Sequence, residues 1–302
     1  MALFHKAEKK RAKLRLGITG TAGSGKTYGA LLVAFGLGGK IALIDTENGS
    51  GDLYSSLGDY DVGSITAPYS VQKYLAAIHE AEQAGYDVII IDSLSHAWSG
   101  EGGLLDVHGA LSASGKGNSY AAWRQVTPMH NKLIDTMLSS PCHIIATMRS
   151  KTEYIQTSND FGKTEIKKVG LAPVQREGMD YEFTTVFELS ANHNVTVSKD
   201  RTGLFDGQIF TLSQNTGIAL REWLDKGYDP KRIKDIYNRY FVICGGQQNH
   251  AVNAMKLIIG DTPSTQLTEE QLIALEEDLK NRENGVQENK NENENETITT
   301  AP

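Results

Sequence analysis

Cysteine is scarce in this chain of 302 residues: only Cys142 and Cys244 occur, far apart in the sequence. Two distant cysteines exclude a disulfide-stapled scaffold and a paired-cysteine zinc module, and they fit a reducing cytosolic compartment. A chain of this length buries about three quarters of its unfolded surface, so it needs neither disulfides nor a structural metal in order to fold. The eight histidines show no ligand spacing. We therefore expect a cytoplasmic protein without a structural metal site.

The sequence also lacks a long apolar run and a strong excess of one charge. No stretch approaches the roughly 20 apolar residues that cross a bilayer. The charged N-terminus is not followed by the apolar segment of a signal peptide, so we expect no membrane partner. With 30 Lys and Arg against 37 Asp and Glu, the net charge is −7. This balance argues against a protein coated in nucleic acid but not against one local basic groove.

Short apolar runs alternate with helical stretches through the first two hundred residues. This pattern is typical of an α/β fold with a mostly parallel sheet. We predict strands of that sheet at residues 14–19, 40–45, 87–92 and 142–147. The last three are apolar almost throughout, as expected of strands covered by helices on both faces. An antiparallel extension is predicted at residues 181–189, 194–198 and 208–212.

After residue 217 the pattern becomes helical. The first predicted helix begins after Asp229, a good N-cap before Pro230, and runs to Cys244. A second helix is predicted at 249–259. A third begins at Thr268, which forms a capping box with Gln271. From Asn281 the chain is rich in Asn and Glu with almost nothing apolar, which predicts disorder.

A glycine-rich segment follows the first predicted strand and opens a predicted helix. It matches the pattern GxxxxGK[ST], and we predict that it binds ATP through Gly20, Thr21, Ala22, Gly23, Ser24, Gly25, Lys26, Thr27 and Tyr28. Glycines let successive N–H groups point at phosphate oxygens, and the helix N-terminus adds a positive end. Lys26 would neutralise the β- and γ-phosphates.

Carboxylates end two of the apolar strands. Asp92 is placed next to the phosphate loop, where it is predicted to hold Mg²⁺ together with the hydroxyl of Thr27. Asp45 and Glu47 end another strand and share a face if the strand persists. Glu47 is the candidate that orients or deprotonates the attacking water, and Glu101 is the alternative base.

These three segments, in this order, resemble the core of RecA-like recombinases. In that class the strand after the phosphate-loop helix ends in an aspartate, followed two residues later by the catalytic glutamate. A later strand ends in Asp-Ser, as at Asp92 and Ser93. The resemblance therefore implies that Glu47 is catalytic. The block 14–212 looks like the compact phage members of the class, the Sak-type single-strand annealing ATPases, which implies a phage-encoded protein in the host cytoplasm.

The same resemblance implies two loops that bind single-stranded DNA. Residues 112–119 and 152–178 lie where the family has its first and second DNA-binding loops. Basic residues beside aromatic ones suit single strands, because phosphates meet the cations and bases stack on the rings. The predicted nucleic-acid contacts are Lys116, Lys163, Lys167, Lys168 and Arg176. From the residues alone, an ordinary solvated hairpin is the alternative for 152–178.

Two further segments resemble contacts between protomers. Lys199 and Arg201 are similar to the paired basic residues that RecA-type protomers insert into a neighbour's ATP site, where they clamp developing phosphate charge. A basic turn that pairs with Asp206 is the alternative. Residues 4–7 fit the short FxxA element by which related recombinases hold a neighbour, and a frayed N-terminus is the alternative there.

The chain departs from the family at one position. The family has a glutamine that senses the γ-phosphate at the end of the fourth strand, whereas this chain has Met148 and Arg149. Arg149 is chemically able to contact phosphate. The coupling between ATP and the DNA loops is therefore left open.

Together these features predict an α/β, RecA-like P-loop core with a mostly parallel sheet, an antiparallel extension and a small C-terminal helical region. We divide the chain into an oligomerisation arm (1–13), the ATPase core (14–217), the helical region (218–280) and a disordered acidic tail (281–302). The predicted function is an oligomeric, Mg²⁺-dependent ATPase that binds single-stranded DNA for annealing or recombination, with ATP between subunits. No sequence feature singles out a partner such as a single-strand-binding protein.

The same residues are compatible with two other functions. An ATP-dependent switch or assembly factor acting on a protein partner is the main alternative. A small-molecule kinase is less favoured, because the sequence has no arginine-rich lid and Glu47 suits water activation better than transfer to a second substrate.

Overall fold

The computed structural model describes residues 7, 9–113, 119–158, 164–227, 229–264 and 267–298, with backbone only for 152–158, 164–170, 230 and 285–298. The chain divides into two compact units. One is Lys13–Trp223, and the other combines Met1–Ala12 with Leu224–Pro302. Each unit is described by itself below.

The larger unit is built on one sheet with the strand order β3-β2-β4-β5-β1-β7-β8, and β6 pairs with β5 alone. Neighbours from β3 to β7 in this order are parallel, whereas β8 and β6 run antiparallel to their partners. The predicted mostly parallel sheet with an antiparallel extension is confirmed. The strands are β1 (Arg15–Gly20), β2 (Ile41–Asp45), β3 (Asp61–Ser64), β4 (Val88–Asp92), β5 (His143–Ser158), β6 (Thr164–Pro173), β7 (Thr185–Leu189) and β8 (Val195–Asp200).

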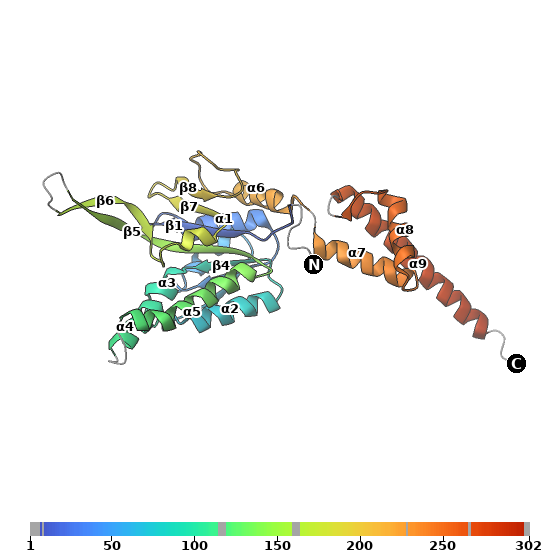
Figure 1. The fold of residues 1–302 in the computed structure, drawn as a ribbon, viewed down its shortest axis with the longest axis horizontal. Coiled ribbons are helices and arrows are strands. Elements are labelled where there is room, and N and C mark those ends of the chain that lie inside the picture. The colour runs from blue at the N-terminus through green and yellow to red at the C-terminus, as the bar shows by residue number, and fades with distance from the viewer. Residues whose placement is uncertain are drawn as a thin grey trace. The chain divides into compact units, whose positions relative to one another are not determined.

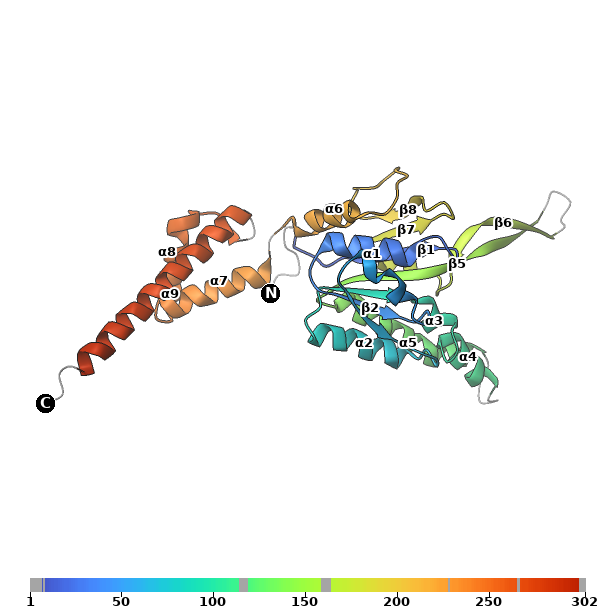
Figure 2. The same ribbon diagram turned by 180° about the vertical axis from the view of Figure 1, so that it is seen from behind.

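Helices cover both faces of this sheet (Figures 1 and 2). The views show α2 and α5 on one face and α1 on the other. In chain order the helical segments are α1 (Lys26–Leu37), η1 (Ser50–Leu57), α2 (Val71–Gln83), α3 (Ser95–Ser99), α4 (Leu104–Ala113), α5 (Ser119–Ser139), η2 (Met179–Glu182) and α6 (Gln214–Asp225).

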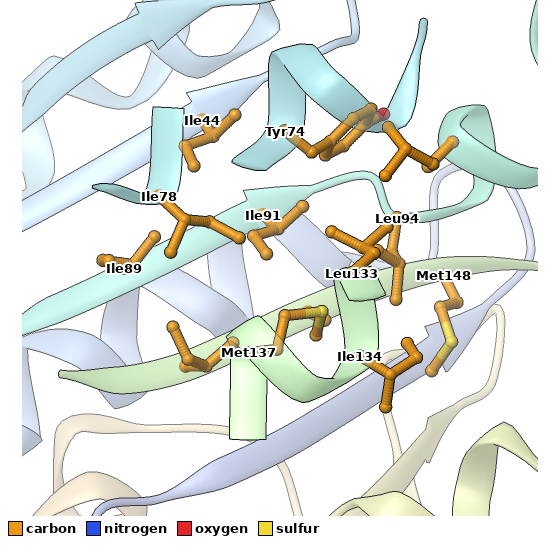
Figure 3. Close-up of a cluster of buried hydrophobic side chains, with 14 of the residues drawn as sticks. Ile44, Tyr74, Ile78, Ile89, Ile91, Leu94, Leu133, Ile134, Met137 and Met148 are labelled. Atoms are coloured by element: carbon orange, nitrogen blue, oxygen red, sulfur yellow. The ribbon is translucent and has the colours of Figure 1, made fainter. Parts of the chain in front are cut away.

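The main core lies between the sheet and the helices α2 and α5. Alternate strand residues point into it, such as Ile89 and Ile91 of β4, and they meet Ile78 of α2 and Leu133 of α5 (Figure 3). All five residues of β4 are buried. Strands covered on both faces are apolar at nearly every position, which is why the sequence shows no polar alternation before Asp92.

Strand β5 differs most from its prediction. The sequence predicts that it ends at residue 147, but it continues to Ser158 and forms a long hairpin with β6. Figure 1 shows this hairpin extending beyond the other strands of the sheet. The sequence of its outer part, residues 150–158, has no run of apolar residues, so the apolar pattern that predicts the first half of β5 gives no signal for the second.

The predicted strand at 208–212 is wrong. Only one bridge forms there, between Val195 and Phe210. The ring of Phe210 packs against Phe187 and Phe205, with centroids 5.5 and 5.1 Å away. The apolar residues of this segment therefore serve ring packing instead of a strand ladder.

Helix α6 belongs largely to the larger unit, which ends at Trp223 instead of the expected residue 217. Glycines allow α6 to approach α1 closely: a Cβ at Gly36 would lie 2.0 Å from the Gln214 carbonyl oxygen, and one at Gly217 would lie 2.1 Å from the carbonyl oxygen of Val33. Real side chains are excluded at such distances, so the contact requires glycine at both positions.

Where its residues are described, the smaller unit is built from the helices α7 (Pro230–Ile243), α8 (Gln248–Ile259) and α9 (Glu269–Ile298). Asp229 caps α7 by accepting hydrogen bonds from the backbone of Lys231 and Arg232 at 2.9 and 3.1 Å. The capping box of α9 is also present, with Gln271 N–H donating to the Thr268 hydroxyl at 3.2 Å and Thr268 N–H donating to Gln271 Oε1 at 3.1 Å.

Helix α9 continues through the segment that composition assigned to a disordered tail from residue 281. Helical hydrogen bonds are local and do not require buried apolar surface, and Glu, which alternates with the weaker helix former Asn in this segment, is a good helix former. Composition indicates whether a segment has apolar surface to bury. It does not indicate whether the backbone N–H and C=O groups of the segment form hydrogen bonds with one another in a helix. Arg239 of α7 adds a tertiary contact near the start of this segment by pairing with Glu283 at 2.8 Å.

The N-terminal arm packs within the smaller unit. Arg11 pairs with Glu269 at 2.9 Å, and the Ala12 N–H donates to the Leu224 carbonyl at 3.4 Å. Of the FxxA element, residues 4–6 lie outside the described residues. Across the part of the chain that the structure describes, no helix is long and apolar enough to span a membrane.

Candidate functional site

The glycine-rich loop connects β1 to α1 and curls tightly. Gly23 and Gly25 have φ values of 73° and 87°, a left-handed backbone that glycine adopts readily. Lys26 lies over the loop, since its Nζ donates to the carbonyl of Thr21 at 2.8 Å. Burial lowers the pKa of Lys26, while the charges of Asp92 and Glu47 oppose that shift. The predicted phosphate cradle and the two acids therefore form one electrostatic site.

Asp92 and Thr27 meet at the start of α1. The Thr27 hydroxyl donates to Asp92 Oδ2 at 2.5 Å, and the hydroxyl of Thr147 on β5 donates to the other carboxylate oxygen. Burial raises the pKa of Asp92, against these hydrogen bonds. A hydroxyl and a carboxylate so placed are the hard oxygen donors that Mg²⁺ prefers, so this pair fits the predicted role.

The two carboxylates at the end of β2 have different environments. Asp45 is 1 % exposed and accepts hydrogen bonds from the backbone of Glu47 at 2.5 Å and of Gly51 at 3.0 Å. It therefore holds the turn that presents Glu47. The carboxylate of Glu47 accepts two hydrogen bonds from Arg149, from Nε at 2.9 Å and from Nη2 at 2.8 Å. Burial would raise the pKa of Glu47, but Arg149 outweighs it and holds the pKa below its usual value.

Thr46 ties the ends of β2 and β4 together behind Glu47. Its N–H donates to the Asp92 carbonyl at 2.7 Å, and its hydroxyl accepts from the Ser93 N–H at 2.8 Å. The same hydroxyl lies 2.7 Å from His96 Nδ1 on α3. The alternative base, Glu101, is exposed, and its backbone carbonyl accepts from Tyr69 at 2.7 Å.

Arg149 occupies the point where β5 leaves the sheet. It pairs in register with Gly20, the last residue of β1. Its N–H donates to the Ser95 hydroxyl at 2.9 Å, and its carbonyl accepts from the N–H of Val174 at 2.6 Å, just after β6. The residue that holds Glu47 is therefore also the base of the β5–β6 hairpin.

A pocket of about 550 Å³ adjoins the phosphate loop, and the sequence predicts only four of its lining residues, Gly23, Ser24, Gly25 and Tyr28, as part of the nucleotide site. The Tyr28 ring meets the Tyr54 ring edge-on at 6.1 Å. A pocket with aromatic and aliphatic walls beside a phosphate cradle fits a nucleobase. Residues from five separate segments line this pocket. They are Gly23, Ser24, Gly25, Tyr28, Gly29, Leu32, Tyr54, Leu189, His193, Thr211 and Leu212.

A protein-family model described as an AAA domain (AAA_24) matches residues 12–218, more than half of the chain. The chain belongs to this AAA-domain family. Its core is thus a P-loop ATPase core, and the family implies nucleotide binding, typically with Mg²⁺. No curated protein matches the chain.

The predicted DNA-binding residues of this AAA-domain protein gather around the β5–β6 hairpin, as far as the structure describes them. Lys116 and Lys163 lie outside the described residues. Lys167 and Lys168 lie on β6, in register with Ile155 and Tyr154 of β5. Arg176 follows the hairpin and lines a cleft at its base with Lys151. The cleft also holds Glu177, Asp180 and Glu188, so its charge is mixed.

Lys199 and Arg201 lie away from the phosphate loop of their own AAA domain. Lys199 pairs in register with Val186 near the start of β7. Because β7 is parallel to β1, this position lies toward the amino ends of the parallel strands, whereas the phosphate loop follows the carboxyl end of β1. Lys199 Nζ donates to the carbonyls of Asp180 and Tyr181 at 2.9 and 2.5 Å, and Arg201 Nη2 donates to the latter at 3.0 Å. The structure therefore does not bring these two cations together with the other predicted catalytic residues.

Proposed function

We propose that this P-loop ATPase hydrolyses ATP with Glu47 as the base and couples turnover to single-stranded DNA held along the β5–β6 hairpin, in annealing or recombination. The observation that carries the proposal is the continuity of β5. This strand lies between the phosphate-loop strand and the Asp92 strand, and it runs without a break from Arg149 into the hairpin. The resemblance to phage annealing ATPases supports the same reading.

The chemistry assigned to the site follows from its residues. The loop N–H groups and Lys26 bind the phosphates. Thr27 and Asp92 would hold Mg²⁺, which neutralises charge on the β- and γ-phosphates when bound. Glu47 orients the attacking water and takes its proton at a carboxylate oxygen.

The hairpin suits single-stranded DNA because its strand pairing places a lysine opposite an aromatic residue. Lys168 lies opposite Tyr154 on the neighbouring strand. Phosphate contacts supply most non-specific affinity, and bases stack on aromatic rings whatever their sequence. A hairpin that extends beyond the sheet leaves room for a strand to pass alongside it.

We further propose that the active unit is an oligomer. Lys199 and Arg201 lie at the sheet edge opposite the phosphate loop of their own chain, so only another protomer's site is available to them. A clamp of this kind acts on charge that develops on the phosphates.

The test compares two triple variants of the full chain. Lys163→Ala/Lys167→Ala/Lys168→Ala removes the three predicted DNA-contacting charges between residues 163 and 168, and Lys132→Ala/Lys226→Ala/Lys280→Ala removes three from exposed positions elsewhere. Single-stranded DNA should raise ATP turnover of the wild type and of the control. The hairpin variant should bind DNA about tenfold or more weakly at low salt and lose the stimulation.

Two results would overturn the DNA assignment. One is a wild type that does not bind single strands at low salt, where phosphate contacts are strongest. The other is equal DNA binding by both triple variants. Either result would favour an ATP-dependent switch that acts on a protein partner.

A further inference from the structure

The turn between β7 and β8 reaches the phosphate loop through one side chain. Residues 190–194 form a tight turn in which the Ser190 N–H donates to the Asn194 carbonyl at 2.9 Å and the His193 N–H donates to the Ser190 carbonyl at 3.0 Å. His193 has φ 64°, a left-handed backbone that non-glycine residues adopt uncommonly and among which asparagine, aspartate and histidine are enriched. The turn therefore places the imidazole in a constrained position.

The imidazole contacts the loop at its most curved part. His193 Nδ1 lies 3.0 Å from the carbonyl oxygen of Ser24. A Cβ at Gly25 would lie 3.1 Å from the same nitrogen, closer than a side chain normally packs. The ring consequently occupies the space that the absence of a side chain at Gly25 creates.

This contact determines the tautomer. A backbone carbonyl can only accept, so Nδ1 carries the proton and donates it to Ser24. In the neutral ring, Nε2 is then a hydrogen-bond acceptor. His193 also lines the pocket that lies beside the phosphate loop, with Tyr28, Tyr54, Thr211 and Leu212. An acceptor is thus presented where the nucleoside part of a bound nucleotide would lie.

We propose that His193 is a specificity-determining residue that reads a hydrogen-bond donor on the nucleoside through Nε2, while Nδ1 positions the phosphate loop. This inference rests on the proposed nucleotide site. The donor is either the 6-amino group of adenine or a ribose hydroxyl, and a 6-oxo purine would present an acceptor to an acceptor. The same imidazole therefore links the choice of nucleotide to the shape of the loop.

The test measures binding of nucleoside diphosphates, which hydrolysis does not consume, to the full chain with Mg²⁺ by calorimetry. The probes are ADP, IDP, 2′-deoxyADP and 3′-deoxyADP, with inorganic pyrophosphate as the probe without a nucleoside. The wild type should prefer ADP over one of the analogues by about fivefold to tenfold, the value of one neutral hydrogen bond. Loss of affinity for IDP identifies the 6-amino group, and loss for a deoxy analogue identifies the hydroxyl.

Two substitutions separate the ring from the turn. His193→Gly keeps a left-handed turn without a side chain, and His193→Asn tolerates the same backbone and keeps a donor for the Ser24 carbonyl. Both should abolish the preference for ADP. His193→Asn should bind pyrophosphate as the wild type does. Asn192→Ala, in the same turn, is the matched control and should retain the preference.

Several results would overturn the assignment. The assignment is wrong if the wild type binds ADP and all three analogues equally. It is also wrong if the preference for ADP survives in both His193 variants. An equal loss of pyrophosphate and ADP affinity in both variants shows that His193 only supports the loop. If the wild type binds neither ADP nor pyrophosphate, while remaining folded, the nucleotide site itself fails and this inference fails with it.

Discussion

Arg149 and Glu47 form a two-pronged ion pair, Nε to Oε1 at 2.9 Å and Nη2 to Oε2 at 2.8 Å, across the carboxyl ends of β5 and β2. The side chains are 48 % and 28 % exposed, and partly exposed pairs contribute only about 0–1 kcal/mol to stability. The consequence of the pair is therefore chemical. It fixes the orientation of the proposed base and lowers its pKa.

Glu47→Gln should nearly abolish ATP turnover. The amide keeps the shape of the side chain but cannot take a proton from water, and a positioned base contributes about 10²–10⁴-fold to the rate. Steady-state ATPase assays should show kcat reduced by about 100-fold or more, whereas the affinity for ATP changes little. Glu101→Gln, which alters the other candidate base, should retain nearly full turnover. The opposite ranking of the two variants would transfer the role to Glu101.

Arg149→Gln should move the acid limb of the activity profile to higher pH. Glu47 must be ionised to act, and its pKa rises when the arginine is removed, because hydrogen bonds and charge from Arg149 hold it down. Activity is then lost earlier as the pH falls. His96 lies beside this pair, and burial and the charge of Arg149 lower its pKa. Removing Arg149 therefore changes the titration of His96 as well, and a His96→Gln variant controls for that effect. The measurement is kcat against pH for the three proteins, and superimposable acid limbs would contradict the assignment.

The parts of the fold that depend on local pattern could be predicted from sequence. Buried strands such as β4 can be recognised because every residue before the final Asp92 is apolar, and the loop from Gly20 to Thr27 has a spacing that phosphate binding requires. The N-cap at Asp229 and the capping box at Thr268 are likewise local chemistry. Each of these features needs only neighbouring residues to form.

The parts that depend on contacts between distant segments could not. Glu47 and Arg149 lie a hundred positions apart, and no motif links them. His193 touches the phosphate loop only because β7 pairs with β1 and ends in a turn of the right length. Phe210 looks like a strand residue in sequence, yet it packs against Phe187 and Phe205. Sheet order and turn geometry decide such contacts.

Thr27→Val should raise the Mg²⁺ concentration needed for turnover. The hydroxyl that valine lacks is one of two oxygen donors at the proposed metal position, and loss of a supporting group at a metal site commonly costs about 10–100-fold in affinity. Titration of ATP turnover with Mg²⁺ should show a midpoint raised by at least about tenfold. Thr27→Ser keeps the hydroxyl and should resemble the wild type. Equal midpoints for the valine and serine variants would exclude Thr27 as a ligand.

Mixing two inactive variants should restore activity if Lys199 and Arg201 act on a neighbour. Lys26→Ala lacks a working phosphate site but has intact cations, and Lys199→Ala/Arg201→Ala has an intact site without them. In a mixed oligomer the first supplies the cations to the second. ATP turnover of the mixture should exceed the sum of the separate proteins. A strictly additive result would leave these cations only their observed contacts with the backbone of η2.

Acidification should destabilise the protein through His143. Its Nδ1 accepts a hydrogen bond from the Leu14 N–H at 3.0 Å, and burial, assisted by Lys13 and Arg15, lowers its pKa to about 3. The unfolded chain binds a proton near pH 6.5, while the folded protein does not until about pH 3. The unfolded state therefore gains protons as the pH falls between these values, and folding stability is lost over that window.

The expected loss from His143 between pH 7 and pH 5 is about 2 kcal/mol. His143→Asn offers an amide oxygen to Leu14 and cannot titrate, so its unfolding free energy should fall less over the same range. The matched control is His79→Asn at an exposed position of α2, which should retain the wild-type pH dependence. Urea unfolding of the full chains at several pH values measures the difference. Parallel curves for the wild type and His143→Asn would mean that the folded protein accommodates a protonated imidazole at this position.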